Sequence, residues 1–258
     1  MNFVDEQVSE EPLLGGNASV GIVRVGDTVR RPARPWSTNV DALLQHMESV
    51  GFDGAPRALG YDDRGRQVLS FVEGFVDPDP FDLDLARVFE VGELISQLHE
   101  AVASFRPPSE AVWNVLIYPD QDELICHHDL APWNLVRTEN RLTFIDWDSA
   151  GPGSKLWDLA YAAHGFVPLS PRSGLSDDAA AERLRALVDG YALAAPARPA
   201  LVSMLGLRVR SMYEFLKDSH DRDVEPWSRL WREGHGRTWL EDAHYIDQRR
   251  RVWEAAIF

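Results

Sequence analysis

Cysteine, lysine and long hydrophobic runs are scarce in this sequence. Cys126 is the only cysteine among 258 residues, so no internal disulfide can form and cysteine-rich metal sites are excluded. No stretch holds the roughly eighteen uninterrupted apolar residues of a membrane helix, and the first residues lack the basic start and apolar core of a signal peptide. We therefore expect a cytoplasmic protein whose fold rests on side-chain packing.

The charge balance is strongly acidic. The formal net charge is −15, and Lys155 and Lys217 are the only lysines. Such a surface repels nucleic acid and anionic membranes, so we expect neither as a partner. It suits a cationic substrate, although plain solubility explains the same excess. With 45% hydrophobic residues the chain can bury a core in one large domain or two small lobes.

The first part of the chain has the pattern of a small β-rich unit. Residues 20–25 and 28–31 flank a Gly26-Asp27 turn, which predicts a hairpin, and residues 68–72 predict a further strand. Between them apolar residues recur at helical spacing and stop at Gly51, with Ser37 or Thr38 as candidate helix caps. These apolar residues are Val40, Leu43, Leu44 and Met47.

The acidic, proline-bearing stretch 76–80 has the composition of a boundary. Beyond it two apolar stripes predict amphipathic helices, separated by a short β-like region over residues 123–145. The stripes are Val88, Val91, Leu94, Ile95 and Leu98, then Leu184, Leu187, Val188 and Tyr191.

Polar side chains interrupt the apolar residues of this β-like region. His127, Asp129 and Asn134 lie among core-forming residues, and Asp146 follows Phe144-Ile145. Polar groups in such positions are costly unless they are paired or used. The three oxygen donors suit a hard cation such as Mg²⁺, which prefers carboxylate and carbonyl oxygens.

The pattern His127-x-Asp129-x4-Asn134, followed after a hairpin by Ile145-Asp146-Trp147, resembles the catalytic loop and metal-binding segment of aminoglycoside phosphotransferases, relatives of protein kinases. The resemblance extends from Gly15 to about Ala163. It takes in Gly51-Phe52 to Gly60, Glu73-Gly74, Leu98-His99, Gly151-Pro152-Gly153 and Trp157-Asp158-Leu159-Ala160. It implies an α+β, bilobal, protein-kinase-like fold, with a nucleotide-binding lobe at 1–74 and a mostly helical lobe at 75–258.

The same resemblance implies an activity and the residues that perform it. Asp129 is the expected base for a substrate hydroxyl that attacks the γ-phosphate of ATP or GTP, and His127 braces the loop. Asn134 and Asp146 are the expected Mg²⁺ ligands, while Asp158 is expected to bond loop backbone. The acceptor is a small hydroxylated molecule, for which a cationic aminoglycoside-like antibiotic is one candidate.

The nucleotide-binding residues depart from the kinase pattern, because this lobe has no lysine. Residues two apart in a strand share a face, so Val29 can cover the base while Arg31 points at the phosphates and Arg30 faces outward. Phe71 and Glu73, at the end of the last strand, complete the expected nucleotide site. In kinases a carboxylate on the neighbouring helix pairs with the lysine. Either Asp41 or Glu48 can form the corresponding pair with the arginine here, and the sequence does not distinguish them.

Several features allow two interpretations. Gly15-Gly16-Asn17 is either a nucleotide lid or a plain turn. In the simpler interpretation, His128 is a loop residue, and the alternative is that it is a ligand. Cys126 is, in the simpler interpretation, a buried strand residue rather than a nucleophile. The carboxylates at 218, 221, 223 and 225 either bind an aminated substrate or form a solvated loop.

Two other functions compete with the kinase. The absent lysine motivates a catalytically weak, kinase-like binding or immunity protein, although such a protein has no need for Asp129, Asn134 and Asp146 together. The adjacent His128-Asp129 pair suggests a metal phosphohydrolase. That class needs further histidines on helices, which the β-rich surroundings of the pair do not favour.

Overall fold

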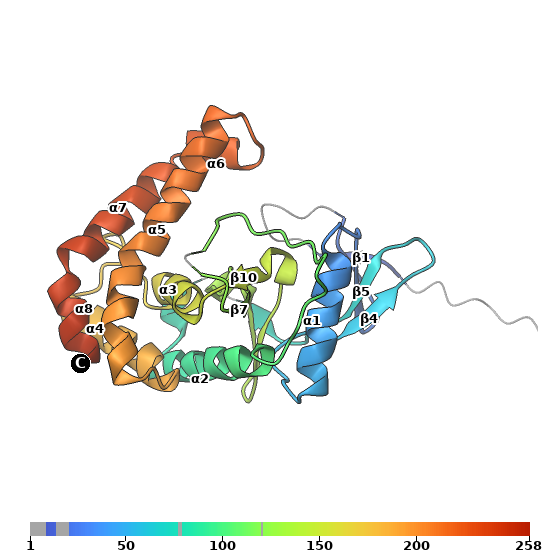
Figure 1. Cartoon of the computed structure of the whole chain (residues 1–258), viewed down its shortest axis with the longest axis horizontal. Helices are drawn as coiled ribbons and strands as arrows, with labels where there is room; N and C mark the ends of the chain where they lie inside the picture. Colours follow the sequence, from blue (N-terminus) through green and yellow to red (C-terminus); the bar gives the residue numbers. More distant parts are fainter. Residues whose placement is uncertain (1–8, 14–20, 77–78, 120) are drawn as a thin grey trace, which may run out of the picture.

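The computed structural model describes residues 9–13, 21–76, 79–119 and 121–258. The Gly15-Gly16-Asn17 turn or lid lies outside these residues. The first lobe is a five-stranded antiparallel sheet in the order β1-β2-β3-β5-β4 (Figure 1). Its strands are β1 (Glu11–Pro12), β2 (Val23–Val25), β3 (Thr28–Arg31), β4 (Ala58–Tyr61) and β5 (Gln67–Ser70). The expected hairpin is therefore present as β2 and β3.

One helix, α1 (Ser37–Ser49), packs beside this sheet and buries the predicted apolar stripe. It ends where Gly51 takes a φ of +84°, a left-handed conformation that glycine adopts without strain. The predicted caps are wrong: Trp36 precedes the helix and makes no capping side-chain bond. Ser37 is instead a buried helical residue whose hydroxyl accepts from the Arg34 N–H, at 2.9 Å.

Two small sheets of the second lobe carry the chemistry-bearing motif. The first has the strand order β6-β8-β9, from β6 (Phe75–Val76), β8 (Leu135–Arg137) and β9 (Leu142–Phe144). The second pairs β7 (Leu124–Cys126) with β10 (Gly151–Gly153). Short 3-10 turns at Pro132–Asn134 and Trp147–Ser149 connect these strands and turn the chain back on itself. The hairpin that separates Asn134 from Asp146 is thus β8 and β9.

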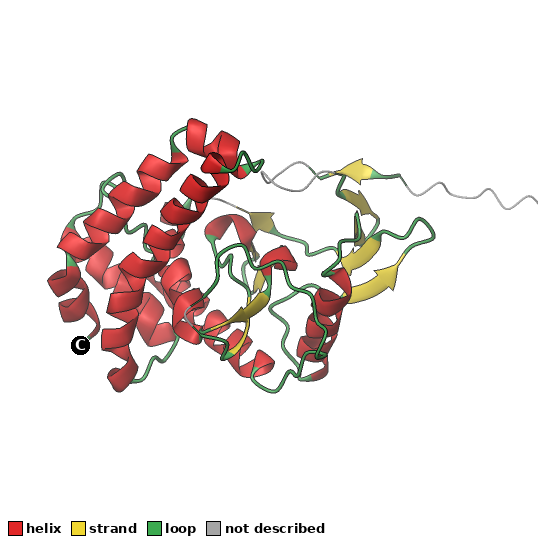
Figure 2. Ribbon diagram, turned by 45° about the horizontal axis from the view of Figure 1, so that its top comes forward, coloured by secondary structure: helices red, strands yellow, loops and turns green. Residues whose placement is uncertain are grey.

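Most of the rest of the second lobe is helical, and most of these helices lie at the end opposite the five-stranded sheet (Figure 2). α2 packs on α4, and α5 packs on α3, α6 and α7. The helices are α2 (Leu85–Val102), α3 (Lys155–Phe166), α4 (Asp177–Gly190), α5 (Arg198–Asp221), α6 (Trp227–Arg232), α7 (His235–Gln248) and α8 (Arg250–Ile257).

Close contact between α2 and α4 depends on two glycines. A Cβ on Gly92 would collide with the Leu187 carbonyl oxygen, and one on Gly190 would collide with the Phe89 carbonyl oxygen. The helix backbones can approach this closely only because both side chains are absent. This packing fixes α2 in the second lobe, where it also contacts β7.

The α+β class and the division into a small β-rich lobe and a larger, mostly helical lobe are confirmed. Among the described residues no helix is long and apolar enough to cross a membrane.

Candidate active site

Asp129 and Asn134 lie together in the loop between β7 and β8. The Asn134 Nδ2 donates to the Asp129 carboxylate at 2.7 Å and to the Asp129 carbonyl at 3.0 Å. Asn134 is buried, whereas Asp129 is half-buried. The 3-10 turn at Pro132–Asn134 makes the contact possible, because it brings back a residue five positions along the chain. The carboxylate is therefore held in one orientation by its own loop.

His127 lies behind this loop and is fully buried. Its Nδ1 accepts from the Asp129 N–H at 3.2 Å, so Nε2 carries the ring proton and donates to the Ile145 carbonyl at 3.1 Å. The ring also packs against Trp147, with centroids 4.5 Å apart. His127 thus links the segment of Asp129 to the segment of Asp146, which is the geometry of a brace. A fully buried ring cannot contact substrate.

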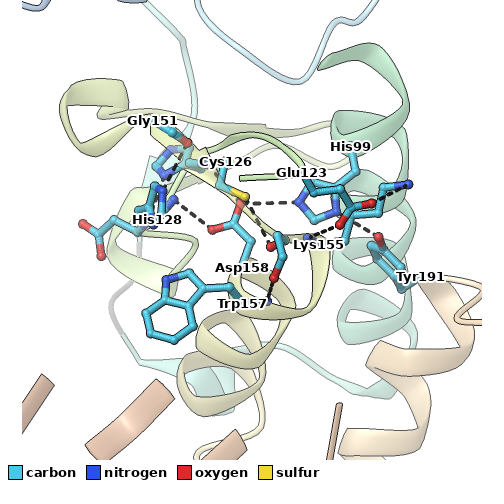
Figure 3. Close-up of polar contacts among 12 residues, drawn as sticks. His99, Glu123, Cys126, His128, Gly151, Lys155, Trp157, Asp158 and Tyr191 are labelled. Atoms are coloured by element: carbon cyan, nitrogen blue, oxygen red, sulfur yellow. Dashed lines mark hydrogen bonds and ion pairs between the residues drawn. The ribbon is translucent and has the colours of Figure 1, made fainter. Parts of the chain in front are cut away.

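Asp158 on α3 anchors the same loop from the opposite side (Figure 3). Its two carboxylate oxygens accept from the N–H groups of His127 at 2.9 Å and His128 at 2.8 Å. Burial alone would raise the pKa of Asp158, but the hydrogen bond and charge of His99, with the charges of His128 and His127, lower it to about 2. Asp158 is therefore a fully buried anion held by backbone donors, as expected of a residue that bonds loop backbone.

A buried network extends from Asp158 towards the helices. His99 lies 3.4 Å from Asp158 through Nε2 and 2.9 Å from the Tyr191 hydroxyl through Nδ1. The Cys126 thiol donates to the Ser154 carbonyl at 3.3 Å. His99, Cys126 and Asp158 could hold a metal by spacing alone, since their ligand atoms lie within 4.8 Å of one another. Their hydrogen bonds instead join α2, α3 and the end of α4 to the loop that carries Asp129.

Arg31 and Asp146 face each other between the lobes. Arg31 is buried at the end of β3, and its Nη1 lies 3.8 Å from the Asp146 carboxylate. Its Nη2 forms a closer ion pair with Asp148, which also accepts from the Trp36 indole N–H at 3.0 Å. Asp146 has a left-handed backbone (φ 61°) that follows the hairpin and keeps its side chain 45% exposed. An arginine thus reaches the segment in which kinases bind metal.

The structure distinguishes the two carboxylates of α1. Asp41 is buried and accepts from the Gln67 amide at 2.5 Å, and Gln67 pairs with Arg31 across β3 and β5. Burial raises the pKa of Asp41, whereas Gln67 and the charge of Arg31 lower it. Glu48 instead pairs with Arg57 at 3.1 Å on the surface. Asp41 is therefore the α1 carboxylate on the Arg31 side.

Two residues that were expected to bind the nucleobase, Phe71 and Glu73, contact Arg24, which the sequence analysis did not identify. Arg24 and Val29 are directly opposed across β2 and β3, so they share the face of the sheet that carries Arg31, whereas Arg30 has the opposite face. The Arg24 guanidinium lies 3.8 Å from the Phe71 ring centroid and pairs with Glu73 at 2.6 Å. Arg24 thus belongs to the same cluster as Phe71 and Glu73, and its alternation with Val23 and Val25 was the available signal.

The remaining open features have local explanations. His128 is buried with φ 67°, and its Nε2 contacts the carbonyls of Gly151 and Pro152 at 3.2 and 3.0 Å. Burial lowers the pKa of His128. The acidic residues at the end of α5 and just after it each pair with a neighbouring cation rather than form a free acidic patch. The pairs are Asp218 with Arg222, Asp221 with Lys217, and both Asp223 and Glu225 with Arg232.

Two cavities among the described residues lie away from the loop that carries Asp129. One of about 700 Å³ is lined by acidic residues of α2, including Glu90, Glu93 and Glu100. The other, of about 560 Å³, touches Phe71 and Glu73 from the side of α1 and the β8–β9 hairpin. Neither is lined by Asp129 or by Arg31, so neither is the site of the candidate chemistry.

The donor set around Asp129 fits a hard cation. Asp146 offers an accessible carboxylate, and the hydrogen bonds of the Asn134 side chain among the described residues use its nitrogen, which leaves the amide oxygen for a ligand role. Oxygen donors of this kind, with places left for water, are what Mg²⁺ prefers.

The comparisons with known proteins agree with this arrangement. Residues 42–202 match the model of the phosphotransferase enzyme family. The trifolitoxin immunity protein of Rhizobium leguminosarum bv. trifolii is 34% identical over 269 residues, which cover 97% of this chain and all of that protein.

Two solved structures share the fold. The amicoumacin kinase hAmiN, in complex with AMP-PNP, Ca²⁺ and Ami, has a TM-score of 0.64 at 11% identity and covers 96% of this chain and 89% of its own. A choline/ethanolamine kinase family protein from Mesorhizobium loti has a TM-score of 0.61 at 20% identity, over 98% and 93% of the two chains. The kinase-like fold is therefore confirmed, and this chain belongs to the phosphotransferase enzyme family.

Proposed function

We propose that this protein transfers the γ-phosphate of ATP or GTP to a hydroxyl group of a small toxic compound. The transfer inactivates the compound and so protects the cell that produces this protein. The observation that carries the proposal is that the fixed carboxylate of Asp129 lies in a loop that His127 ties to the segment of Asp146, whose own carboxylate lies 3.8 Å from Arg31. The 34% identity to an immunity protein supports protection as the purpose.

Each residue has a defined task in this reaction. Asp129 accepts the proton of the acceptor hydroxyl as the oxygen attacks phosphorus, the bond to the bridging oxygen breaks, and the nucleoside diphosphate leaves. Asn134 keeps the carboxylate oriented by its 2.7 Å bond. Arg31 provides a forked donor for phosphate oxygens, and Val29, Phe71 and Glu73 border the base.

Asn134 and Asp146 are the proposed ligands of Mg²⁺. When bound, the ion neutralises charge on the nucleotide phosphates. Asp41 and Gln67 keep the Arg31 side of the site polar and ordered. The net charge of −15 supports a cationic acceptor, such as an aminoglycoside-like antibiotic.

A second function, immunity by binding without chemistry, has one observation in its favour. The relative with 34% identity is named for immunity rather than for a kinase activity. In that case the toxin is sequestered, and Asp129 contributes nothing to protection.

Calorimetry with ATP and with GTP, each with and without Mg²⁺, tests the nucleotide part of the proposal. We expect binding that depends on Mg²⁺. Phosphorus NMR with a panel of hydroxylated antibiotics and toxins then identifies the acceptor through a new phosphate ester. Absence of binding by both nucleotides contradicts the kinase function and favours sequestration.

The variant Asp129→Ala separates the two functions. We expect phosphoryl transfer to fall about 10²-fold or more, because general-base contributions run to about 10²–10⁴. Protection of a sensitive host should be lost together with turnover. Asp53→Ala, an exposed loop residue away from the catalytic loop, is the matched control. Full protection by Asp129→Ala means that the protein acts by binding.

A further inference from the structure

Arg208, in the middle of α5, is a buried cation that the reaction above does not use. It is 2% exposed and lies in a slot between two aromatic rings of α3. Its guanidinium carbon is 4.9 Å from the Trp157 ring centroid and 4.3 Å from that of Tyr161. Trp157 and Tyr161 are four residues apart and so share one face of α3.

The hydrogen bonds of Arg208 are incomplete. Its Nη2 donates to the His128 carbonyl at 3.3 Å, but neither Nε nor Nη1 has a partner anywhere in the described part of the chain. Burial lowers the pKa of Arg208, while the charges of Tyr161, Asp158 and Asp129 act to raise it. A guanidinium stays protonated even so, and an under-bonded buried charge is costly. Packing alone would be served better by an apolar side chain.

Two of the residues that Arg208 contacts, His128 and Tyr161, also adjoin Asp129, the proposed catalytic base. His128 directly precedes Asp129 and has a φ of 67°, a conformation that a non-glycine residue adopts only when its surroundings impose it. Asp158 holds the N–H of His128 from one side, and Arg208 holds its carbonyl from the other. Residue His128 is thus held at both its N–H and its carbonyl, and the Asp129 N–H of the following peptide group is held by His127.

Tyr161 makes a second connection to the base. Burial, the charge of Asp129 and a side-chain hydrogen bond to Asp129 all raise the pKa of Tyr161 well above its usual value. The hydroxyl therefore keeps its proton and can donate it to the Asp129 carboxylate. Arg208 lies against the face of the same ring, so it supports Asp129 through Tyr161 as well as through His128.

We propose that Arg208 is a positioning residue for the phosphoryl-transfer reaction, which holds the strained His128 peptide and the Tyr161 ring so that Asp129 faces the acceptor. It acts through these two residues and does not touch substrate. The inference rests on the proposed function for its kinetic consequence, but its structural consequence, an ordered loop at residues 127–129, is measurable without an acceptor.

The test compares Arg208→Met and Arg208→Lys with the wild-type protein. Met keeps the length without the charge, whereas Lys keeps the charge without the fork. For Arg208→Met we expect kcat to fall about 10–100-fold, because small misplacements of a catalytic group have effects of that size. The nucleotide KM should stay within about twofold, since no nucleotide contact is removed. Arg208→Lys should recover part of kcat.

Hydrogen exchange gives the readout that is independent of turnover. We expect faster exchange of the amides at 127–129 in Arg208→Met, at urea concentrations where the rest of the protein stays protected. Arg210→Met is the control, because Arg210 lies two residues along α5 and pairs with Asp247 at the surface. It should change neither kcat nor loop exchange.

Three results overturn the proposal. They are wild-type kcat in Arg208→Met, unchanged exchange at 127–129, or, where Arg208→Met does not fold, full activity and wild-type exchange in Arg208→Lys. Failure of the proposed function looks different, because the wild-type protein then binds no nucleotide with Mg²⁺. In that case the exchange experiment still decides whether Arg208 orders the loop.

Discussion

Replacement of Asp158 by asparagine should destabilise the protein far more than an ordinary surface change. The carboxylate is fully buried and accepts two backbone N–H bonds, at 2.9 and 2.8 Å. An amide can satisfy only one of these donors and turns its own N–H₂ towards the other. Hydrogen bonds to charged groups are worth about 1.5–3 kcal/mol each, and breaking a buried charged contact costs about 3–5 kcal/mol. We therefore expect Asp158→Asn to lower the free energy of unfolding by about 3–5 kcal/mol.

The pH dependence of this difference follows from the direction of the pKa shift. The pKa of Asp158 is lowered to about 2 in the folded protein, against about 3.9 for an unfolded aspartate. Its contribution is therefore fully present above about pH 4 and is lost as the pH falls towards 2. Urea unfolding should give the same difference in the free energy of unfolding between wild type and Asp158→Asn at pH 7 and at pH 5. This difference should shrink only in stronger acid.

A matched control and a clear contrary result complete this experiment. Asp221 is an exposed aspartate that pairs with Lys217 one helical turn away, so Asp221→Asn should leave the urea midpoint unchanged. A decrease in the free energy of unfolding of less than about 1 kcal/mol is typical of a surface position. Such a small decrease for Asp158→Asn would refute the anchoring of the loop by this carboxylate.

Two further changes test the metal site and the helix packing. Asp146→Asn should weaken the Mg²⁺ dependence of nucleotide binding by about tenfold or more, and an unchanged Mg²⁺ titration in calorimetry contradicts its role as a ligand. Gly92→Ala should lower the free energy of unfolding by about 1–3 kcal/mol, because its Cβ would meet the Leu187 carbonyl of α4, whereas alanine normally stabilises a helix. A rise in the urea midpoint of that variant would mean that α2 and α4 can separate at little cost.

Local patterns in the sequence predicted the elements well where a single helix or hairpin decided the outcome. The apolar run over residues 20–25 and the Gly26-Asp27 turn predicted the hairpin of β2 and β3, and the stripe from Val40 to Met47 predicted α1, because turn chemistry and the period of burial are properties of the element itself. The cap of α1 was mispredicted because the helix already begins at Ser37, after Trp36, and a local pattern places a helix end only to within a residue or two.

By itself the sequence determined which residues are proposed for the chemistry: Asp129, Asn134 and Asp146 at kinase-like spacing, with arginine as the proposed substitute for lysine. Spacing along the chain is enough for these residues because they belong to one loop and one hairpin. The tertiary structure alone decided which distant residues act on them. Asp41 rather than Glu48 lies on the side of Arg31, Arg24 joins Phe71 and Glu73, and Arg208 reaches His128 across 80 positions. Such partners depend on how strands and helices pack, and a buried charge shows its purpose only when its surroundings are known.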